Sequence, residues 1–219
     1  MRSICIIPAF EEEVTIGQVI AGALKHCSTV VVVDDNSEDQ TATVSRRAGA
    51  KVIRHMLRLG TGAALSTGFR AALSTDSEIF LTMDCDGQHT PDQIPDVMQP
   101  ISKGEADVVV GSRLLSAPEG MPLGKRFGNR ILSATTSLAA GTRITDSQSG
   151  FRAYHRKVLE YAIHEARDYR WASEILILTA KGNFRISSTI RATAVYLPKR
   201  QRGTSIKDGL KILYSTMKR

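Results

Sequence analysis

Five short apolar runs alternate with segments of helical spacing along the first half of the chain. Runs this short and this rich in β-branched residues are typical of strands buried on both faces, and helices join them. This alternation indicates an α/β fold whose central sheet is mostly parallel, with helices on both faces. The predicted strands are residues 3–7, 29–33, 51–53, 79–83 and 107–110, and the predicted helices are residues 14–26, 39–48, 60–73 and 91–101.

The second half of the chain is less regular but carries the same two kinds of pattern. No internal repeat, low-complexity segment or linker divides the 219 residues, which are enough for one sizeable core. We therefore expect a single domain. The patterns predict helices over 127–140, 156–165, 172–180 and 205–218 and a strand pair over 184–190 and 192–197.

Polar clusters follow four of the predicted strands, at the point where each strand ends. Ligands of open α/β sheets bind outside the carboxyl ends of the strands, and parallel strands bring those ends to one edge. We therefore expect the clusters to share one site, although they are far apart in the chain. The clusters are residues 8–13, 34–39, 84–86 and 111–113.

Asp84 and Asp86 end the fourth predicted strand and precede a turn glycine, Gly87. Mg²⁺ and Mn²⁺ prefer hard oxygen ligands and often bind through one or two carboxylates plus substrate phosphates. A lone pair of this kind is also common in solvated turns. Because other polar clusters share the same edge, we interpret the pair as holding a divalent cation against a nucleoside diphosphate.

Other acids also follow predicted strands or fall in polar segments. Asp34 and Asp35 could accept hydrogen bonds from a base or a ribose, whereas one of them could instead cap the next helix. Asp146 opens a segment dense in hydrogen-bonding groups that includes Gln148 and Arg152. Asp146 is a candidate base or orienting carboxylate, and an ordinary turn is the alternative for that segment.

Cations gather in and after a loop rich in proline and glycine, residues 112–124. The arginine fork binds phosphate oxygens well, so this loop suits an acceptor that carries a phosphate. Ordinary surface charge is the alternative, above all for Lys125 and Arg130. The cations are Arg113, Lys125, Arg126 and Arg130.

Cysteine and histidine show no spacing of metal ligands. Cys5, Cys27 and Cys85 are odd in number, which favours free thiols in a reducing compartment. No apolar run is long enough to predict a membrane span, and no signal peptide is evident. We expect surface or core positions for His26, His55, His155 and His164. His89 is next to the acid pair and could contact a substrate, but we expect a turn position for it.

The net charge of +7 is concentrated at the end of the chain. Residues 196–219 hold seven cations against one acid, on a body that is nearly neutral. This favours contact with an anionic partner at one place. The predicted last helix has an apolar face beside its lysines, which suits an interfacial helix on anionic lipid, or equally a helix docked on the body.

Taken in order, these motifs resemble the family 2 inverting glycosyltransferases, and within them the dolichyl- or polyprenyl-phosphate sugar synthases. The resemblance extends from about residue 4 to residue 205 and is specific for the family but not for the sugar. Its motifs are Pro8-Ala9-Phe10-Glu11-Glu12, Val33-Asp34-Asp35-Asn36-Ser37, Asp84-Cys85-Asp86-Gly87-Gln88-His89, Gly111-Ser112-Arg113 and Asp146-Ser147-Gln148-Ser149-Gly150-Phe151-Arg152.

The resemblance implies a role for each motif. The nucleotide sugar would contact Pro8, Ala9, Phe10, Glu12, Val33, Asp35, Asp84, Cys85 and Arg200. Mg²⁺ or Mn²⁺ would be held by Asp86, Gln88 and Asp84. The acceptor phosphate would contact Arg113, Arg126 and Gln148, and the catalytic residues would be Asp146 and Asp86.

The resemblance also implies a GT-A-like, nucleotide-sugar-binding fold in one domain. Residues 1–115 would bind the nucleotide sugar, residues 116–200 the acceptor, and residues 201–219 would form the basic amphipathic helix. The expected reaction moves a hexose from a UDP- or GDP-linked donor to a polyprenyl or dolichyl phosphate. We expect a peripheral enzyme at the cytoplasmic face of the membrane, which could work with a membrane partner subunit.

Three other functions compete with this interpretation. A family 2 transferase could act on a soluble glycan instead of a lipid. A sugar-1-phosphate nucleotidyltransferase also uses a metal and an α/β fold, but its glycine-rich amino-terminal loop is replaced here by residues 8–12. A nucleic-acid-binding module would use the basic tail, but only Tyr196 and Tyr214 in that tail could stack on bases, so we expect no nucleic-acid partner.

Overall fold

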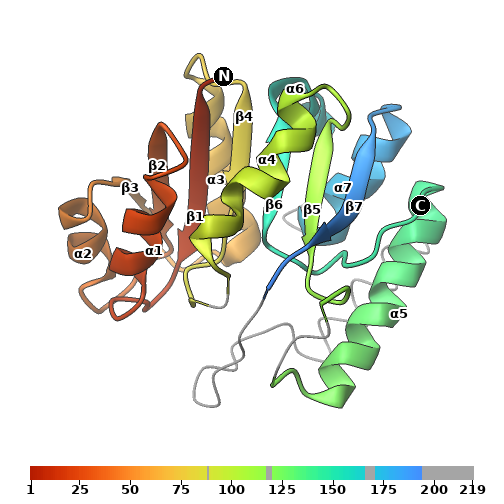
Figure 1. Ribbon diagram of the computed structural model, residues 1–219. Helices are drawn as coiled ribbons and strands as arrows, with labels where there is room; N and C mark the ends of the chain where they lie inside the picture. Colours follow the sequence, from red (N-terminus) through yellow and green to blue (C-terminus); the bar gives the residue numbers. More distant parts are fainter. Residues whose placement is uncertain (88, 117–119, 166–170, 194–219) are drawn as a thin grey trace.

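The structure is a computed structural model that describes residues 1–87, 89–116, 120–165 and 171–193 (Figure 1). Within these residues the strands form one seven-stranded sheet in the order β3-β2-β1-β4-β6-β5-β7. The sheet is mostly parallel, as predicted, and β6 alone is antiparallel to both of its neighbours. The strands are β1 (Ser3–Ala9), β2 (Thr29–Asp34), β3 (Lys51–Arg54), β4 (Ile79–Thr82), β5 (Val108–Ser112), β6 (Arg152–His155) and β7 (Ile186–Arg191).

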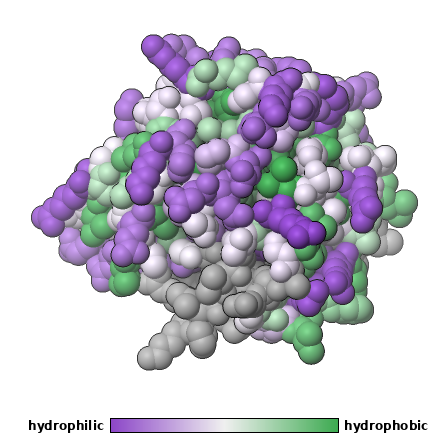
Figure 2. All heavy atoms as spheres, viewed as in Figure 1, coloured by the Kyte–Doolittle hydropathy of each residue, from purple (hydrophilic) through white to green (hydrophobic). Residues whose placement is uncertain are grey.

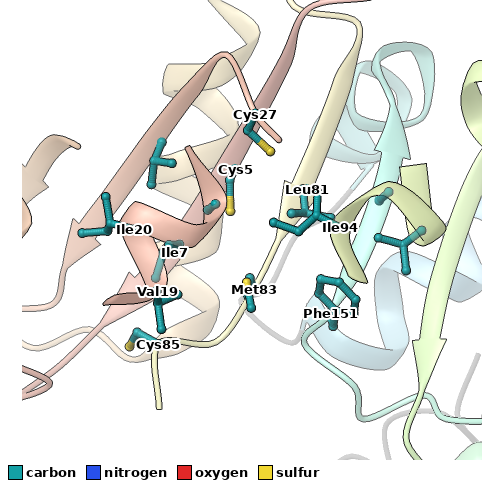
Figure 3. Close-up of a cluster of buried hydrophobic side chains, with 14 of the residues drawn as sticks. Cys5, Ile7, Val19, Ile20, Cys27, Leu81, Met83, Cys85, Ile94 and Phe151 are labelled. Carbon is teal, nitrogen blue, oxygen red and sulfur yellow. The ribbon is translucent and has the colours of Figure 1, made fainter. Parts of the chain in front are cut away.

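Helices cover both faces of the sheet, which confirms the predicted α/β architecture (Figure 1). Successive residues of β1 point to opposite faces, so Cys5 and Ile7 pack with α1 and α4, and Ile4 and Ile6 pack with α3, α6 and α7. Figure 3 shows the first of these two clusters. The helices are α1 (Ile16–Ala23), α2 (Thr41–Arg47), α3 (Thr61–Leu73), the short 3-10 helix η1 (Pro91–Gln93), α4 (Ile94–Ser102), α5 (Leu123–Ala140), α6 (Arg156–Glu165) and α7 (Trp171–Lys181).

The first strand is longer than predicted, because it continues through Pro8 to Ala9. Proline lacks an N–H and is usually excluded from central strands. The carbonyl of Ile6 accepts from the Met83 N–H, so the backbone of alternate residues in β1, including Pro8, faces β4. β4 pairs with β1 only as far as Ile6, so Pro8 stands beyond the last strand partner on that side.

The first member of the predicted strand pair near the end of the chain is confirmed as β7. Ala192 and Thr193, at the start of the predicted second member, are irregular. β7 pairs in parallel with β5 on the edge that β6 leaves open, and local pattern does not reveal which edge is free. Residues 194–197 and the predicted helix over 205–218 lie outside the described residues. No helix among the described residues has the length and apolar character needed to cross a membrane.

Candidate active site

The clusters that follow β1, β2, β4 and β5 lie along one edge of the sheet, as predicted, because these four strands are parallel. β6 runs in the opposite direction between β4 and β5, so its amino end reaches the same edge. Residues 146–151 precede β6 and therefore meet the segments that follow β4 and β5. The antiparallel strand thus adds a fifth polar segment to the site.

Arg113 and Asp146 form a buried ion pair at this edge. The guanidinium donates from Nε to Oδ2 at 2.8 Å and from Nη2 to Oδ1 at 3.0 Å, and the Arg113 backbone N–H donates to Oδ2 at 3.1 Å. Asp146 is fully buried and Arg113 is 6% exposed. Two-pronged pairs of this kind are strong and directional. Asp146 therefore fixes the orientation of Arg113, while action of Asp146 on a substrate stays a prediction.

Asp84 packs against Gly150, which precedes the antiparallel strand β6. A Cβ at residue 150 would lie 2.5 Å from Oδ2 and 2.6 Å from Oδ1 of Asp84, so only glycine leaves room for this carboxylate. Burial raises the pKa of Asp84, and three nearby cations oppose that rise. The cations are Arg113, Arg152 and Lys125. Asp84 is therefore placed by the fold among positive charges rather than in open solvent.

Lys125, in the first turn of α5, lies within electrostatic range of the same carboxylates. Partial burial and the charge of Arg113 lower the pKa of Lys125, and the charges of Asp86 and Asp84 act in the opposite direction. Lys125 therefore lies near the acid pair, and its contact with a substrate phosphate stays a prediction. Arg126 is partly buried with its Nε unpaired, which leaves one donor available for a bound anion.

The acid pair fits a divalent cation only together with further ligands. Asp84 and the partly exposed Asp86 offer hard oxygen donors at the end of β4. Across the part of the chain that the structure describes, no three histidine, cysteine or acidic side chains converge on one point. Mg²⁺ commonly completes its shell with substrate phosphates and water, which this site permits. The predicted ligand Gln88 lies outside the described residues.

Cys85 separates the two acids and points back to β1. Its thiol donates to the Pro8 carbonyl oxygen at 3.2 Å. Burial, followed by the nearby charges of three acids, raises the pKa of this thiol well above its ordinary value. The acids are Glu12, Asp84 and Asp86. Cys85 is therefore a neutral thiol that ties the acid pair to β1, and Glu12 belongs to the same acidic cluster.

The two adjacent acids after β2 have different partners. Asp34 is fully buried, accepts from the Ser37 N–H at 3.1 Å and pairs with Arg54 at 3.3 Å, so it shapes the turn. Asp35 accepts from two backbone N–H groups, those of Leu59 at 2.9 Å and Gly60 at 2.7 Å. Asp35 therefore links the end of β2 to the start of α3.

His55 also contacts Asp35, a role that sequence reasoning missed. Its Nδ1 lies 2.8 Å from Asp35 Oδ1, and its Nε2 lies 2.9 Å from Thr67 Oγ1. Burial alone would raise the pKa of Asp35, but the bonds from Leu59, His55 and Gly60 lower it overall. His55 directly follows β3, and the end of an adjacent parallel strand was the one signal that could have indicated this contact.

The remaining donor-side residues divide into side-chain and backbone positions. Phe10 is partly exposed, and the Arg58 guanidinium stacks 3.7 Å above the centre of its ring. Ala9 and Val33 are buried in the two core clusters, so only their backbones reach the edge of the sheet. The predicted donor contact Arg200 lies outside the described residues.

Gln148 and Arg152 shape the segment before β6. Gln148 donates its backbone N–H to Asp146 at 3.2 Å and its side-chain amide to Ser173 at 3.1 Å. The buried Arg152 donates to the carbonyls of Ser147 and Ser149, both at 2.7 Å. The many hydrogen-bonding groups of this segment are therefore used largely for bonds within the segment itself.

His89 is a buried residue and not the turn residue that we predicted. It is 3% exposed, and its ring stacks on Phe151 with centroids 5.2 Å apart. Burial, with Arg113 adding to it, lowers the pKa of His89 to about 4, so the ring is neutral at neutral pH. The chain after the acid pair folds inward because Phe151, from the segment before β6, offers an aromatic face.

Comparison with known proteins places this geometry in a family. Residues 4–162 match the glycosyl transferase family 2 domain. The chain belongs to glycosyl transferase family 2. The family 2 domain thus contains the whole of the acid, cation and Gly150 arrangement described above, and the chain is a glycosyltransferase.

Relatives of this family 2 transferase span most of its length. An uncharacterized protein of Methanocaldococcus jannaschii is 36% identical over 214 residues, which cover 95% of this chain and 88% of that protein. The UDP-N-acetylglucosamine–dolichyl-phosphate N-acetylglucosaminyltransferase of Methanococcus voltae is 35% identical over 95% of this chain and 92% of its own. The dolichyl-phosphate hexose transferase of Haloferax volcanii is 30% identical over 92% of this chain and 84% of that protein.

Solved structures confirm the GT-A-like fold of this family 2 transferase. Glucosyl-3-phosphoglycerate synthase from Mycobacterium tuberculosis, in complex with phosphoglyceric acid, superposes with a TM-score of 0.73 at 22% identity. The match covers 98% of this chain and 79% of that one. The same synthase has also been crystallised with Mn²⁺ and UDP-glucose.

Proposed function

We propose that this family 2 transferase moves a hexose from a UDP- or GDP-linked sugar to a polyprenyl or dolichyl phosphate, with inversion at the anomeric carbon. The observation that carries the proposal is the meeting of Asp84 and Asp86 with Lys125 and Arg113 at one edge of the sheet. Support for the acceptor comes from relatives whose names specify dolichyl phosphate. The identity with these relatives extends along nearly the whole chain.

The donor nucleotide would bind between the ends of β1, β2 and β4. Phe10 offers an aromatic ring for the base, and Asp35 retains about one acceptor site for a base or ribose once its three internal bonds are made. Glu12 stands in the acidic cluster beside Cys85. The backbones of Pro8, Ala9 and Val33 would complete the walls of this pocket, with Asp84 at its inner end.

The acceptor phosphate would bind on the side of β5 and α5. Arg113 is held in place by Asp146, and Arg126 has a free donor nearby. A phosphate monoester has a second pKa of about 6 and is largely a dianion at neutral pH, so its oxygen needs little help from a base. Asp146 would therefore position Arg113, and Gln148 would position Asp146.

The transfer step is an in-line displacement. A phosphate oxygen of the acceptor forms a bond to the anomeric carbon as the bond from that carbon to the donor diphosphate breaks. The electron pair of that bond leaves with the nucleoside diphosphate, and Lys125 would offset its growing negative charge while Arg113 holds the acceptor. Mg²⁺ or Mn²⁺, held by Asp86 and Asp84, would supply further positive charge to the same leaving group.

The lipid acceptor implies contact with a membrane. We propose peripheral association with the cytoplasmic face, where nucleotide sugars and the free thiols of this chain would both be found. The basic residues 196–219 would add attraction to anionic lipid. A membrane partner subunit would serve the same purpose, and reconstitution with pure lipid would reveal whether one is needed.

One assay tests the proposed donor, acceptor and metal. Transfer of labelled sugar from UDP-N-acetylglucosamine, UDP-glucose or GDP-mannose is measured with dolichyl phosphate in detergent, with phosphoglycerate and with a soluble glycan as acceptors, each with Mn²⁺ or with chelator. The proposal predicts a labelled lipid with one donor, and none with chelator. Transfer to phosphoglycerate or to a soluble glycan, with none to lipid phosphate, would overturn the acceptor and leave family membership intact.

A further inference from the structure

Helix α5 turns its polar side to the protein and its apolar side to solvent, which reverses the usual arrangement of a surface helix. Its buried residues are polar: Asn129, Ser133 and Thr136. Four large apolar side chains of the same helix are exposed, and we call them the apolar stripe. The stripe consists of Leu123 (81% exposed), Phe127 (67%), Ile131 (43%) and Leu138 (84%).

The four side chains of the apolar stripe share one face of α5. With about 100° of rotation and 1.5 Å of rise per residue, they fall within a sector of about 80° that is about 23 Å long. The three buried polar residues lie on the opposite side of the helix. Isolated exposed apolar residues are normal, whereas an aligned row marks an interaction surface. Figure 2 shows hydrophobic side chains gathered at the lower right, over the amino-terminal part of α5.

Cations and no acids accompany the apolar stripe. Exposed Arg130 projects within about 20° of the edge of the stripe, and the half-buried Arg126 lies about 60° from that edge, whereas Lys125 is on the opposite side of the helix. The sequence from Leu123 to Arg143 contains no aspartate or glutamate. Phenylalanine and leucine on one face with arginine beside them are typical of helices that lie in the interface of an anionic membrane. We propose that α5 docks in the plane of an anionic lipid surface through the apolar stripe.

Charge favours a lipid surface over two other possible partners of the apolar stripe. A second copy of the chain would bring two sets of α5 cations together, with no acid on either helix to offset them. The chain's own residues 196–219 carry a net +6, so they too would meet α5 with like charge. An anionic lipid surface offers apolar depth and negative charge at once.

The position of the stripe bears on catalysis, and this part of the inference rests on the proposed function. The stripe begins at Leu123, in the same turn as Lys125 and Arg126. Docking of this turn at headgroup level would bring a membrane-bound phosphate to the acceptor side of the site without requiring it to leave the lipid.

The test is flotation of the full chain with phosphatidylcholine vesicles, with and without phosphatidylglycerol. We expect the wild type to bind the vesicles that contain phosphatidylglycerol. Leu123→Ser combined with Phe127→Ser should weaken this binding by about tenfold or more, since two large apolar side chains no longer enter the lipid. Arg130→Gln should weaken binding to the vesicles that contain phosphatidylglycerol and leave binding to pure phosphatidylcholine vesicles unchanged. Met56→Ser is the matched control, because Met56 is 93% exposed but lies outside α5, and it should bind as the wild type does.

Three results would overturn the inference. The double serine variant could bind vesicles as tightly as the wild type. Binding could instead be lost only when Lys207 and Lys211 are neutralised, which would assign it to residues 196–219. Gel filtration could show that the wild type is a dimer and the double variant a monomer, which would make the stripe a contact between copies. Flotation needs no substrate, so it succeeds or fails independently of the sugar-transfer assay.

Discussion

Both carboxylate oxygens of Asp146 are engaged by Arg113 or by the Gln148 N–H, although Asp146 and Arg113 are 33 residues apart in the chain. Breaking a buried pair by removing one charge costs about 3–5 kcal/mol, because the other charge is left buried without its partner. We therefore expect Asp146→Asn to lower the free energy of unfolding by about that amount and to raise the KM for the acceptor. Denaturant unfolding and steady-state kinetics measure the two effects.

A double-mutant cycle separates the pair from its surroundings. Arg113→Gln combined with Asp146→Asn removes both charges, so the combined variant should lose less stability than the sum of the single losses. If the combined variant instead loses as much stability as the two single variants together, the two side chains do not stabilise each other.

Gly150→Ala should disable the site while leaving most of the fold intact. The new Cβ would stand 2.5 Å from an oxygen of Asp84 and force that carboxylate to move. Misplacement of a functional group by about 1 Å can reduce turnover up to about 100-fold, and we expect a loss of kcat/KM of that order. Gly128→Ala is the control, because nothing lies within 4 Å of its Cβ and alanine in a helix interior stabilises by about 0.5–1 kcal/mol. Full activity of Gly150→Ala would show that the position of Asp84 does not matter for turnover.

Asp86→Asn should abolish metal-dependent transfer with little change in the unfolding midpoint. The side chain is partly exposed and loses one hard oxygen donor and one charge, so we expect kcat/KM to fall by about 100-fold or more. Chelation of the wild type should have the same result, and excess Mn²⁺ should restore it. Asp96→Asn on α4 is the control for a lost surface charge. Transfer by the wild type that survives thorough chelation would contradict the metal role.

Asp107 should make stability depend on pH far from the active site. It pairs with Lys157 at 2.8 Å and accepts from the Arg185 N–H at 2.8 Å. Burial alone would raise its pKa, but these partners lower it from 3.8 to about 2. Because the folded pKa is the lower one, the contribution is complete above about pH 4 and is lost as the pH falls from 4 to 2. At neutral pH the wild type should therefore have a higher melting temperature than Asp107→Asn.

The melting difference between wild type and Asp107→Asn should shrink steadily as the pH falls through that window. Glu105→Gln, two residues away and exposed, should track the wild type at every pH. A difference that is as large at pH 2 as at pH 7 would mean that charge on Asp107 does not contribute.

Most elements were predictable because their patterns are local. The run of valines in β2 and the apolar spacing of α1 each report burial on particular faces, and burial is what makes those segments fold as they do. Asp84, Asp86 and Arg113 could be assigned to one edge because parallel strands place their ends together. The element ends were less certain, and Pro8 shows why: its place in β1 depends on where the neighbouring strand stops.

The sequence by itself determined the α/β class, the polar edge and the family, since each depends on residue type and spacing along the chain. Only the tertiary structure decided that β6 enters between β4 and β5, which sets Gly150 against Asp84 and Asp146 against Arg113. It also decided that His55 holds Asp35 and that α5 faces solvent with its apolar side. Strand order and helix orientation follow from hydrogen bonding and packing between distant segments, and local periodicity carries no information about which distant segment will be the neighbour.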